Sequence, residues 1–423
     1  MRSITLFALA LAACSASESS RVPAQSNAEA RAVADSGATA AVAVAATVVD
    51  TGSSSAAVDD TSIVRGLYVN RFAAQSPARM KKLIAIADST EINALIIDIK
   101  DEFGLNYDSP DPTVARNAGN AGRVPRLKEL LDTLHAHQIL PVARIVVFKD
   151  SVAARVNPDH VIRQPDGSPW RDKKGLTWVD PYDPAIWEYN IRVAEDMARM
   201  GFREIQFDYI RFPEPYKSLP PQVFRDTRGV SKPQALANFF KMACPRLHKL
   251  GARCTADIFG LVTTVPGALE VGQEWEVLAP VTDAVLPMVY PSHYPPGSFG
   301  IARPNAEPYR VVNIAISKAH ERNLKLGITK PGHVRPYLQA FSLKGMMPKY
   351  EAHELEEQKR AVYDAGYDGW VLWSPGSTYD AFLPAFERKL VSRKKPFAAK
   401  GAQPAAVRTV SDSSGTSGAP AIR

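Results

Sequence analysis

Residues 184–209 read PAIWEYNIRVAEDMARMGFREIQFDY and contain one complete repeating unit of the predicted fold. Pro184 to Met200 form an amphipathic stretch that begins with proline, and Gly201 follows it as a helix cap would. Glu204 to Tyr209 then alternate polar with apolar side chains, which is typical of a strand. Helices that alternate with short strands in this way predict a parallel sheet covered by helices.

The same unit recurs between Ile63 and Leu390, and the number of units decides the architecture. Eight units in roughly 330 residues predict a (β/α)₈ TIM barrel with enlarged βα loops over residues 61–391, because an open doubly wound sheet more often has about five to seven strands. The predicted strands are Val64–Val69, Ala94–Ile99, Leu140–Val147, Glu204–Tyr209, Cys254–Phe259, Ala284–Val289, Leu324–Ile328 and Gly369–Trp373. The predicted helices are Pro77–Ser89, Arg126–Gln138, Pro184–Met200, Lys232–Leu250, Gln273–Ala279, Pro308–Arg322, Glu351–Ala365 and Tyr379–Leu390.

The first residues have the pattern of a bacterial lipoprotein signal. One arginine precedes an apolar run from Ile4 to Ala13, and Cys14 follows. The run is too short to span a bilayer, so residues 1–13 are interpreted as a signal peptide. Leu11-Ala12-Ala13-Cys14 resembles a lipobox, which predicts a lipid anchor at Cys14 and a location in the cell envelope. The alternative is a plain secretory signal in which the cysteine is incidental.

Two further segments lack the periodicity of a folded domain. Residues 14–60 are mainly Ala, Ser, Val and Asp and are predicted to be a disordered linker, and residues 392–423 a disordered basic tail. The tail carries part of the net charge of +7, so the barrel itself is closer to neutral and requires no nucleic-acid partner. The tail either lies against anionic lipid or an acidic polymer, or serves solubility alone. We expect a monomer.

After Cys14 the chain has only Cys244 and Cys254, which either form a disulfide or stay reduced. Their spacing matches no zinc motif, and the eight histidines include no close pair on one strand. The sequence therefore predicts no metal site and no cofactor.

Two aspartates follow neighbouring predicted strands at the point where each strand ends. Side chains at the carboxyl ends of barrel strands face the active-site mouth. Asp208 ends the fourth strand on the same face as Gln206, and Asp257 ends the fifth strand beside it. The opposite face of the fourth strand holds Ile205, Phe207 and Tyr209. We therefore expect the two carboxyl groups to converge.

Convergent carboxylates are what glycosidic cleavage requires. One donates a proton to the leaving oxygen, and the other attacks the sugar or activates a water. A neighbouring charge and apolar walls would raise one pKa and leave the other group ionised. Buried Asp208 needs a partner such as Arg144, Lys100 or Arg211. The alternative for either aspartate is a purely structural role.

Further polar and aromatic residues lie on the same predicted rim. Asp98 and Lys100 share one face of the second strand, where they are interpreted as a substrate-positioning pair, with Asp98 and Asp101 as further acid candidates. Aromatic rings in the loops suit sugar stacking. His293 is interpreted as a hydrogen-bonding residue rather than a base. The predicted substrate-binding residues are Asp98, Lys100, Arg144, Trp178, Gln206, Arg211, Tyr290, His293 and Trp373.

Several motifs together resemble one bacterial family over Ile63 to Phe386. They lie at Ala94–Gly104, Trp178–Tyr182, Gln206–Pro213, Ala256–Gly260, Met288–Tyr294 and Arg335–Gln339. The family is that of the "putative glycosyl hydrolases", long designated a domain of unknown function and distantly related to alpha-amylase-type barrels. The resemblance implies a nucleophile at Asp208. It also implies an acid/base on the fifth strand, where Asp257 stands in place of the usual glutamate, and Gln206 replaces an arginine.

The sequence thus predicts a glycoside hydrolase that acts on a bacterial cell-envelope or extracellular polysaccharide. Two alternatives from other classes remain open at this point. One is a non-catalytic carbohydrate-binding barrel, which the aromatic loops would suit equally well. The other is a metal-dependent polysaccharide deacetylase, which would need convergent Asp and His ligands.

Overall fold

The structure is a computed structural model that describes residues 63–227 and 229–396. Eight parallel strands close into a barrel because β1 pairs with both β2 and β9. The short β3 (Gly104–Leu105) adds an antiparallel pairing to the end of β2. The predicted (β/α)₈ barrel is confirmed. Its strands are β1 Arg65–Val69, β2 Ala94–Asp101, β4 Leu140–Val146, β5 Glu204–Asp208, β6 Arg253–Phe259, β7 Ala284–Met288, β8 Tyr337–Gln339 and β9 Trp370–Trp373.

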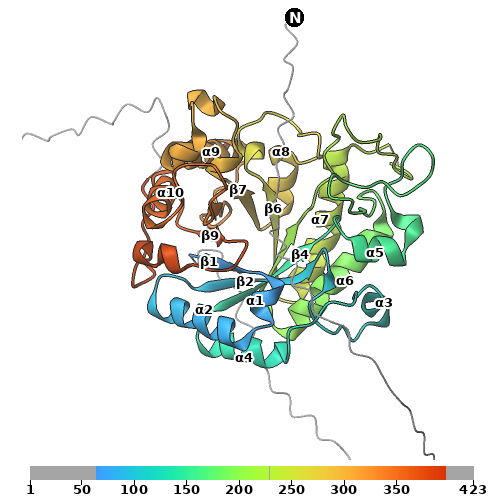
Figure 1. Cartoon of the computed structure of the whole chain (residues 1–423), viewed down its shortest axis with the longest axis horizontal. Coiled ribbons are helices and arrows are strands. Elements are labelled where there is room, and N and C mark those ends of the chain that lie inside the picture. Colours follow the sequence, from blue (N-terminus) through green and yellow to red (C-terminus); the bar gives the residue numbers. More distant parts are fainter. Residues whose placement is uncertain (1–62, 228, 397–423) are drawn as a thin grey trace, which may run out of the picture.

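Helices surround the strands on the outside (Figure 1). Ser76, Asp183 and Ser231 cap the first turns of α2, α6 and α7 with their side-chain oxygens, and a proline follows each cap in the first turn. No described helix is long and apolar enough to cross a membrane. The α-helices are α1 Arg71–Ala74, α2 Pro77–Ser89, α3 Pro112–Ala115, α4 Leu127–Ala136, α5 Ser151–Val156, α6 Pro184–Met200, α7 Lys232–Lys249, α8 Trp275–Leu278, α9 Pro308–Lys325 and α10 Ala352–Asp364.

Short 3₁₀ turns lie in the connections. They are η1 Pro158–His160, η2 Gly260–Thr263, η3 Ala279–Val281, η4 Pro291–His293, η5 Ser298–Gly300, η6 Pro304–Ala306 and η7 Asp380–Ala385. Two of them, η2 and η4, directly follow β6 and β7. They therefore lie at the carboxyl ends of those strands, which is the edge where a barrel of this kind carries its site.

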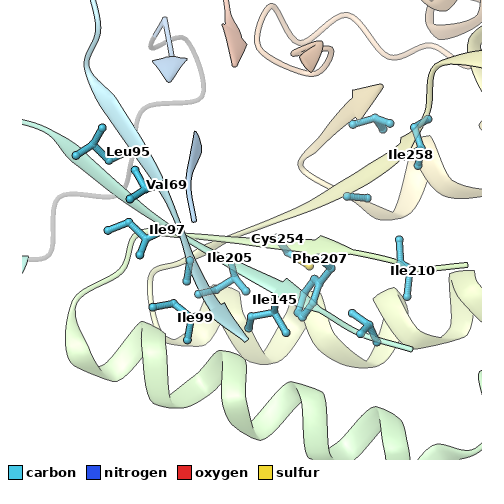
Figure 2. Close-up of a cluster of buried hydrophobic side chains, with 14 of the residues drawn as sticks. Val69, Leu95, Ile97, Ile99, Ile145, Ile205, Phe207, Ile210, Cys254 and Ile258 are labelled. Carbon is cyan, nitrogen blue, oxygen red and sulfur yellow. The ribbon is translucent and has the colours of Figure 1, made fainter. Parts of the chain in front are cut away.

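The main hydrophobic core lies between the strands and the helices. Ile99, Ile145, Ile205 and Phe207 are fully buried, and Figure 2 shows them pointing from the strands toward the helices. Burial of one such side chain contributes about 1.5–3 kcal/mol. Because side chains alternate between the two faces of β5, Gln206 and Asp208 point into the barrel.

The barrel interior contains a second, smaller apolar cluster, which includes Ile96, Val142 and Leu286. Gly66 of β1 permits this packing, because a Cβ there would overlap the side chain of Ile96. Below the mouth, Glu204 forms a buried ion pair with Arg335 at 2.9 Å. The interior is thus filled by side chains rather than open as a pore.

Two predicted elements are wrong. The predicted strand Leu324–Ile328 begins inside α9, which ends at Lys325 and is followed by a turn with Gly327 at φ 71°. The strand at this place in the barrel is β8, whose three residues are too short for a periodicity to be visible. The predicted helix Tyr379–Leu390 is only the short η7, which contains Pro384.

The predicted segments at the chain ends lie largely outside the described residues. These are the signal peptide 1–13, the lipidation site Cys14, the linker 14–60 and most of the tail, so the envelope location stays a prediction. Residues 392–396 are described and follow the barrel surface. Ser392 Oγ donates to Asp368 Oδ2 at 2.7 Å, and Lys395 N donates to Tyr363 O at 2.8 Å. The attached part of the chain therefore continues past the predicted boundary at residue 391.

A disulfide joins Cys244 of α7 to Cys254 of β6, with the two Cα atoms 5.3 Å apart. Both cysteines are buried, and Cys254 lies in the main core (Figure 2). The crosslink therefore ties a barrel strand to the helix that precedes it. Of the two states that the sequence left open, the structure has the oxidised one.

Replacing both cysteines, as Cys244→Ala with Cys254→Ala, should lower the free energy of unfolding by about 2–4 kcal/mol, because the crosslink no longer restricts the unfolded chain. Urea unfolding with and without reductant measures this. Reductant should destabilise the natural protein and leave the double variant unchanged. Titratable thiols at both Cys244 and Cys254 in the untreated, unfolded protein would contradict the assignment.

Candidate active site

A cleft of about 980 Å³, open mouth included, lies over the carboxyl ends of β4 to β9. Its floor carries acidic and basic side chains, and its walls are largely aromatic and apolar. The lining residues are Arg144, Asp208, Tyr209, Arg211, Glu214, Asp257, Ile258, Phe259, Gly260, Leu261, Gln273, Met288, Tyr290, His293, Tyr294, Phe341, Trp373 and Pro375.

Arg144 of β4 is the electrostatic centre of the cleft floor. Parallel register places it beside Asp98 of β2. Its guanidinium forms ion pairs with Asp98 and with Asp208, and its Nε lies 3.1 Å from Asp208 Oδ2 and 3.8 Å from Asp257 Oδ2. One cation therefore contacts three carboxyl groups, all of them almost completely buried.

Three acids around one cation cannot all be ionised without a large cost. Burial and the charge of Asp208 raise the pKa of Asp257 well above its ordinary value, although Arg144 opposes the shift. Burial also raises the pKa of Asp98, whose Oδ2 accepts from Tyr68 Oη at 2.5 Å. Asp208 forms the ion pair with Arg144 on the cleft side, whereas the surroundings of Asp257 favour its protonated form.

Gln206 holds Asp257 in place from below. Its Nε2 lies 2.7 and 2.9 Å from the two oxygens of Asp257, and 2.5 Å from Tyr337 Oη of β8. Gln206 and Tyr337 are both fully buried and do not line the cleft. They therefore orient the carboxyl group rather than contact a ligand.

Aromatic rings form the walls above these charges. Trp373 of β9 stacks on Tyr68 with ring centroids 3.8 Å apart, and the Arg144 guanidinium lies 5.0 Å from the Trp373 ring. Beyond β8 and β7, which follow β9 around the barrel, the rings of Tyr290 and Phe341 meet edge to face at 5.4 Å. Flat apolar faces beside polar groups suit the C–H faces and hydroxyls of a sugar.

The loop after β7 approaches β6 closely at Gly260. A Cβ at this position would lie 2.6 Å from Tyr294 Oη and 2.5 Å from Met288 O, so a larger residue would push the loop away. His293 of the same loop packs edge to face on Tyr290, and burial lowers its pKa to about 4. His293 is therefore neutral across the physiological pH range.

The second basic residue of the cleft, Arg211, is engaged by other side chains. It pairs with Glu214 at 3.1 Å and donates to Phe212 O at 3.1 Å. Its guanidinium also lies 5.0 Å from the Trp178 ring and 4.7 Å from the Phe259 ring. These contacts fix Arg211 in one position at the side of the cleft.

Among the described residues, no group of three or more His, Cys, Asp or Glu side chains is arranged to hold a metal ion. The acids of the cleft instead contact Arg144, Gln206 and Tyr68. These partners do not form the Asp and His set that a metal-dependent deacetylase would need. We therefore derive no step through a metal.

A family model described as "putative glycosyl hydrolase domain" matches residues 66–379. The chain belongs to this family. The match spans the barrel and includes all four charged groups of the cleft floor, namely Asp98, Arg144, Asp208 and Asp257. No curated protein sequence matches the chain.

One solved structure supports the barrel fold. The glycoside hydrolase domain of PgaB (BpsB) from Bordetella bronchiseptica is 15% identical and superposes with a TM-score of 0.55 over 78% of this chain and 100% of that one. A hypothetical protein from Ruminiclostridium thermocellum is 34% identical over 43% of this chain and 92% of that one, with a TM-score of 0.39. At 15% identity the Bordetella domain supports the barrel and nothing finer.

The structure brings together most of the site residues that the sequence of this glycosyl hydrolase predicts. Asp208 and Asp257 line one cleft, together with Arg144, Arg211, Tyr290, His293 and Trp373. Asp98 and Gln206 lie directly behind the lining, in contact with Arg144 and Asp257 respectively. The sequence predicts that Asp98 and Gln206 contact the substrate. In the structure they contact residues that line the cleft instead.

Two predicted substrate-binding residues lie away from the cleft. The register of β2 shifts between Asp98 and Lys100, so these two residues do not share a face. Lys100 is fully buried against α5, where it pairs with Asp150 at 2.7 Å. Trp178 is also buried and packs edge to face on Tyr209 at 5.8 Å. The sequence could not show that a register shift turns Lys100 away from the cleft. It also could not show that Trp178 packs behind a residue that lines the cleft, Tyr209.

Strand alternation predicts that Tyr209 faces the helices, but in the structure its side chain lines the cleft. β5 ends at Asp208, and Tyr209 has a positive φ of 49°, which turns its ring toward the cleft that it lines. The site residues predicted from the sequence do not include Glu214, Phe341, Tyr68 or Tyr337. Tyr68 lies on the inward face of a predicted strand, one residue before its end, so strand alternation could have identified it. The positions of Glu214, Phe341 and Tyr337 depend on the paths of loops or on β8, which the sequence did not reveal.

Arg144→Met should destabilise the fold by about 3–5 kcal/mol at neutral pH, because it leaves buried carboxylates without a counter-charge. The loss should shrink at acidic pH, where the carboxyl groups are neutral in any case. Urea unfolding across pH measures both effects. Arg199→Met, at an exposed pair on α6, is the matched control and should cost less than about 1 kcal/mol. Equal effects of the two changes would contradict the central role of Arg144.

Proposed function

We propose that the barrel hydrolyses the glycosidic bonds of a polysaccharide by a two-carboxylate mechanism. The observation that carries the proposal is that Asp208 and Asp257 line one cleft in contact with the same Arg144, yet in different environments. One is held as the partner of a guanidinium, and the other is buried with a raised pKa. Family membership supports the same class of reaction.

In the proposed reaction Asp257 is the general acid. Its proton passes to the glycosidic oxygen as the bond to the anomeric carbon breaks, and Asp208 attacks that carbon from the other side. Arg144 and the backbone N–H of Tyr209, 2.5 Å from Asp208 Oδ1, hold the nucleophile in place. Asp257, now ionised, then takes a proton from the water that releases the sugar from Asp208.

Retention of configuration is the finer part of the proposal. Asp208 Oδ2 and Asp257 Oδ2 lie 3.1 and 3.8 Å from the same Nε atom, so they are no farther apart than these two distances combined. Retaining enzymes separate their carboxyl groups by about 5–5.5 Å and inverting enzymes by about 6.5–9.5 Å. The shared contact with Arg144 favours the shorter range. The anomeric form of the first product, followed by NMR, reports the outcome directly.

Asp208→Asn should abolish detectable turnover while oligosaccharide binding is kept. Asp257→Asn should reduce kcat by about 10²–10⁴-fold on natural glycosides. The loss should be much smaller on aryl glycosides, whose leaving groups need no proton. Reducing-end detection and product release measure these rates. Asp132→Asn, at an exposed pair with Lys128 on α4, is the control that should leave turnover unchanged.

These variants also distinguish a hydrolase from a non-catalytic carbohydrate-binding protein. If the barrel is a non-catalytic carbohydrate-binding protein, the natural protein binds oligosaccharides but releases no reducing ends, and Asp208→Asn changes nothing further. A uniform loss on natural and aryl glycosides in Asp257→Asn would contradict its role as acid.

The activity should fall as pH rises through the pKa of Asp257. Only the protonated carboxyl can donate, and its pKa is raised by burial and by the charge of Asp208. The folded state thus prefers the protonated form, so Asp257 also lowers the stability progressively as pH rises from its unfolded pKa toward its folded one. A pH profile of kcat/KM measures the alkaline limb. The residual activity of Asp257→Asn serves as the control, and its kcat/KM should show no alkaline limb.

A further inference from the structure

The described residues that line the cleft include two cations, and protein groups engage both of them. Arg144 contacts three carboxyl groups, as described above. Arg211 pairs with Glu214 and packs against aromatic rings. His293 is held neutral by burial. An acidic sugar would therefore meet the carboxylates of the cleft without finding a positive partner of its own.

The same cleft holds neutral hydrogen-bonding groups that lack a protein partner. The hydroxyls of Tyr290 and Tyr294 are buried, and neither has a hydrogen-bond partner among the described residues. Tyr290 lines the cleft together with Asp208 and Asp257. Buried polar groups of this kind are normally hydrogen-bonded, and both tyrosines line the cleft that a sugar would enter.

We propose that the cleft selects an uncharged sugar residue, whose hydroxyl or acetamido groups pair with Tyr290 and Tyr294, and excludes uronic acids. This inference rests on the proposed function and narrows its substrate class. A sugar hydroxyl can donate to one tyrosine oxygen and accept from another, because a phenolic hydroxyl does both. A uronate carboxylate would instead lose its hydration beside Asp208 and Glu214, with no counter-charge to compensate.

Binding and turnover are measured separately so that the two proposals can fail independently. Calorimetry uses Asp257→Asn, which should slow turnover of natural glycosides by about 10²–10⁴-fold and keeps the carboxylates of Asp208 and Glu214 in the cleft. The probes are hexasaccharides of glucose, of N-acetylglucosamine and of glucuronate, which share a ring skeleton and differ in charge. We expect at least one uncharged probe to bind about ten-fold or more tightly than the glucuronate probe. Equal or tighter binding of glucuronate, or no binding of the uncharged probes, overturns the inference.

Two substitutions test the physical cause. Tyr290→Phe should weaken binding of the uncharged probe by about three- to ten-fold, as expected for loss of one neutral hydrogen bond. Tyr309→Phe, at an α9 tyrosine that does not line the cleft, is the matched control and should leave the affinity unchanged. An unchanged affinity in Tyr290→Phe overturns the assignment of its hydroxyl.

Glu214→Gln removes the carboxylate partner of Arg211 and one negative charge from the cleft. If pairing is what excludes acidic sugars, this variant should bind glucuronate several-fold more tightly and the uncharged probe with little change. An unchanged ratio of the two affinities overturns the inference. Strong binding of an uncharged probe without any hydrolysis by the natural protein would leave the selectivity standing and overturn only the hydrolase proposal.

Discussion

Arg144 is the constraint on which the cleft depends. Its guanidinium contacts carboxyl groups from β2, β5 and β6, so three strands of the barrel meet at one positive charge. Removed from water, each of these carboxyl groups would be costly alone. The shared cation lowers that cost, but one charge cannot balance three. Burial raises the pKa of Asp98 and of Asp257 and thereby favours their protonated forms. Asp208 contributes an ion pair with Arg144 on the cleft side.

This division links stability to chemistry. A buried acid with a raised pKa is a liability for folding at neutral pH, and the barrel tolerates it because Gln206 and Tyr337 support Asp257 from beneath. The same proton is what a glycosidic leaving group needs. The ion pair that holds Asp208 in place keeps the nucleophile oriented. The arrangement is therefore a buried polar network at the edge of the barrel that carries the candidate site.

Around this floor, the loops decide what can enter. The β7 loop brings Tyr290, His293 and Tyr294 over the acids, and Gly260 gives it the room to approach. The loop after β5 brings Arg211 and Glu214, which neutralise each other. The rim thus exposes aromatic rings and neutral hydrogen-bonding groups to a ligand, whereas its charged residues Arg211 and Glu214 pair with each other. The proposed selectivity for uncharged sugars rests on this pairing rather than on an absence of basic residues.

The sequence alone determined the barrel, seven of its eight strands, and the convergence of Asp208 with Asp257, because strand alternation and adjacency are local rules that β5 and β6 obey. It could not locate β8, whose three residues carry no period. Nor could it separate Lys100 from Asp98, since a one-residue register shift reverses the face of a side chain. Which residues line the cleft and which support it from behind was decided only by the tertiary structure, because burial depends on segments distant in the chain.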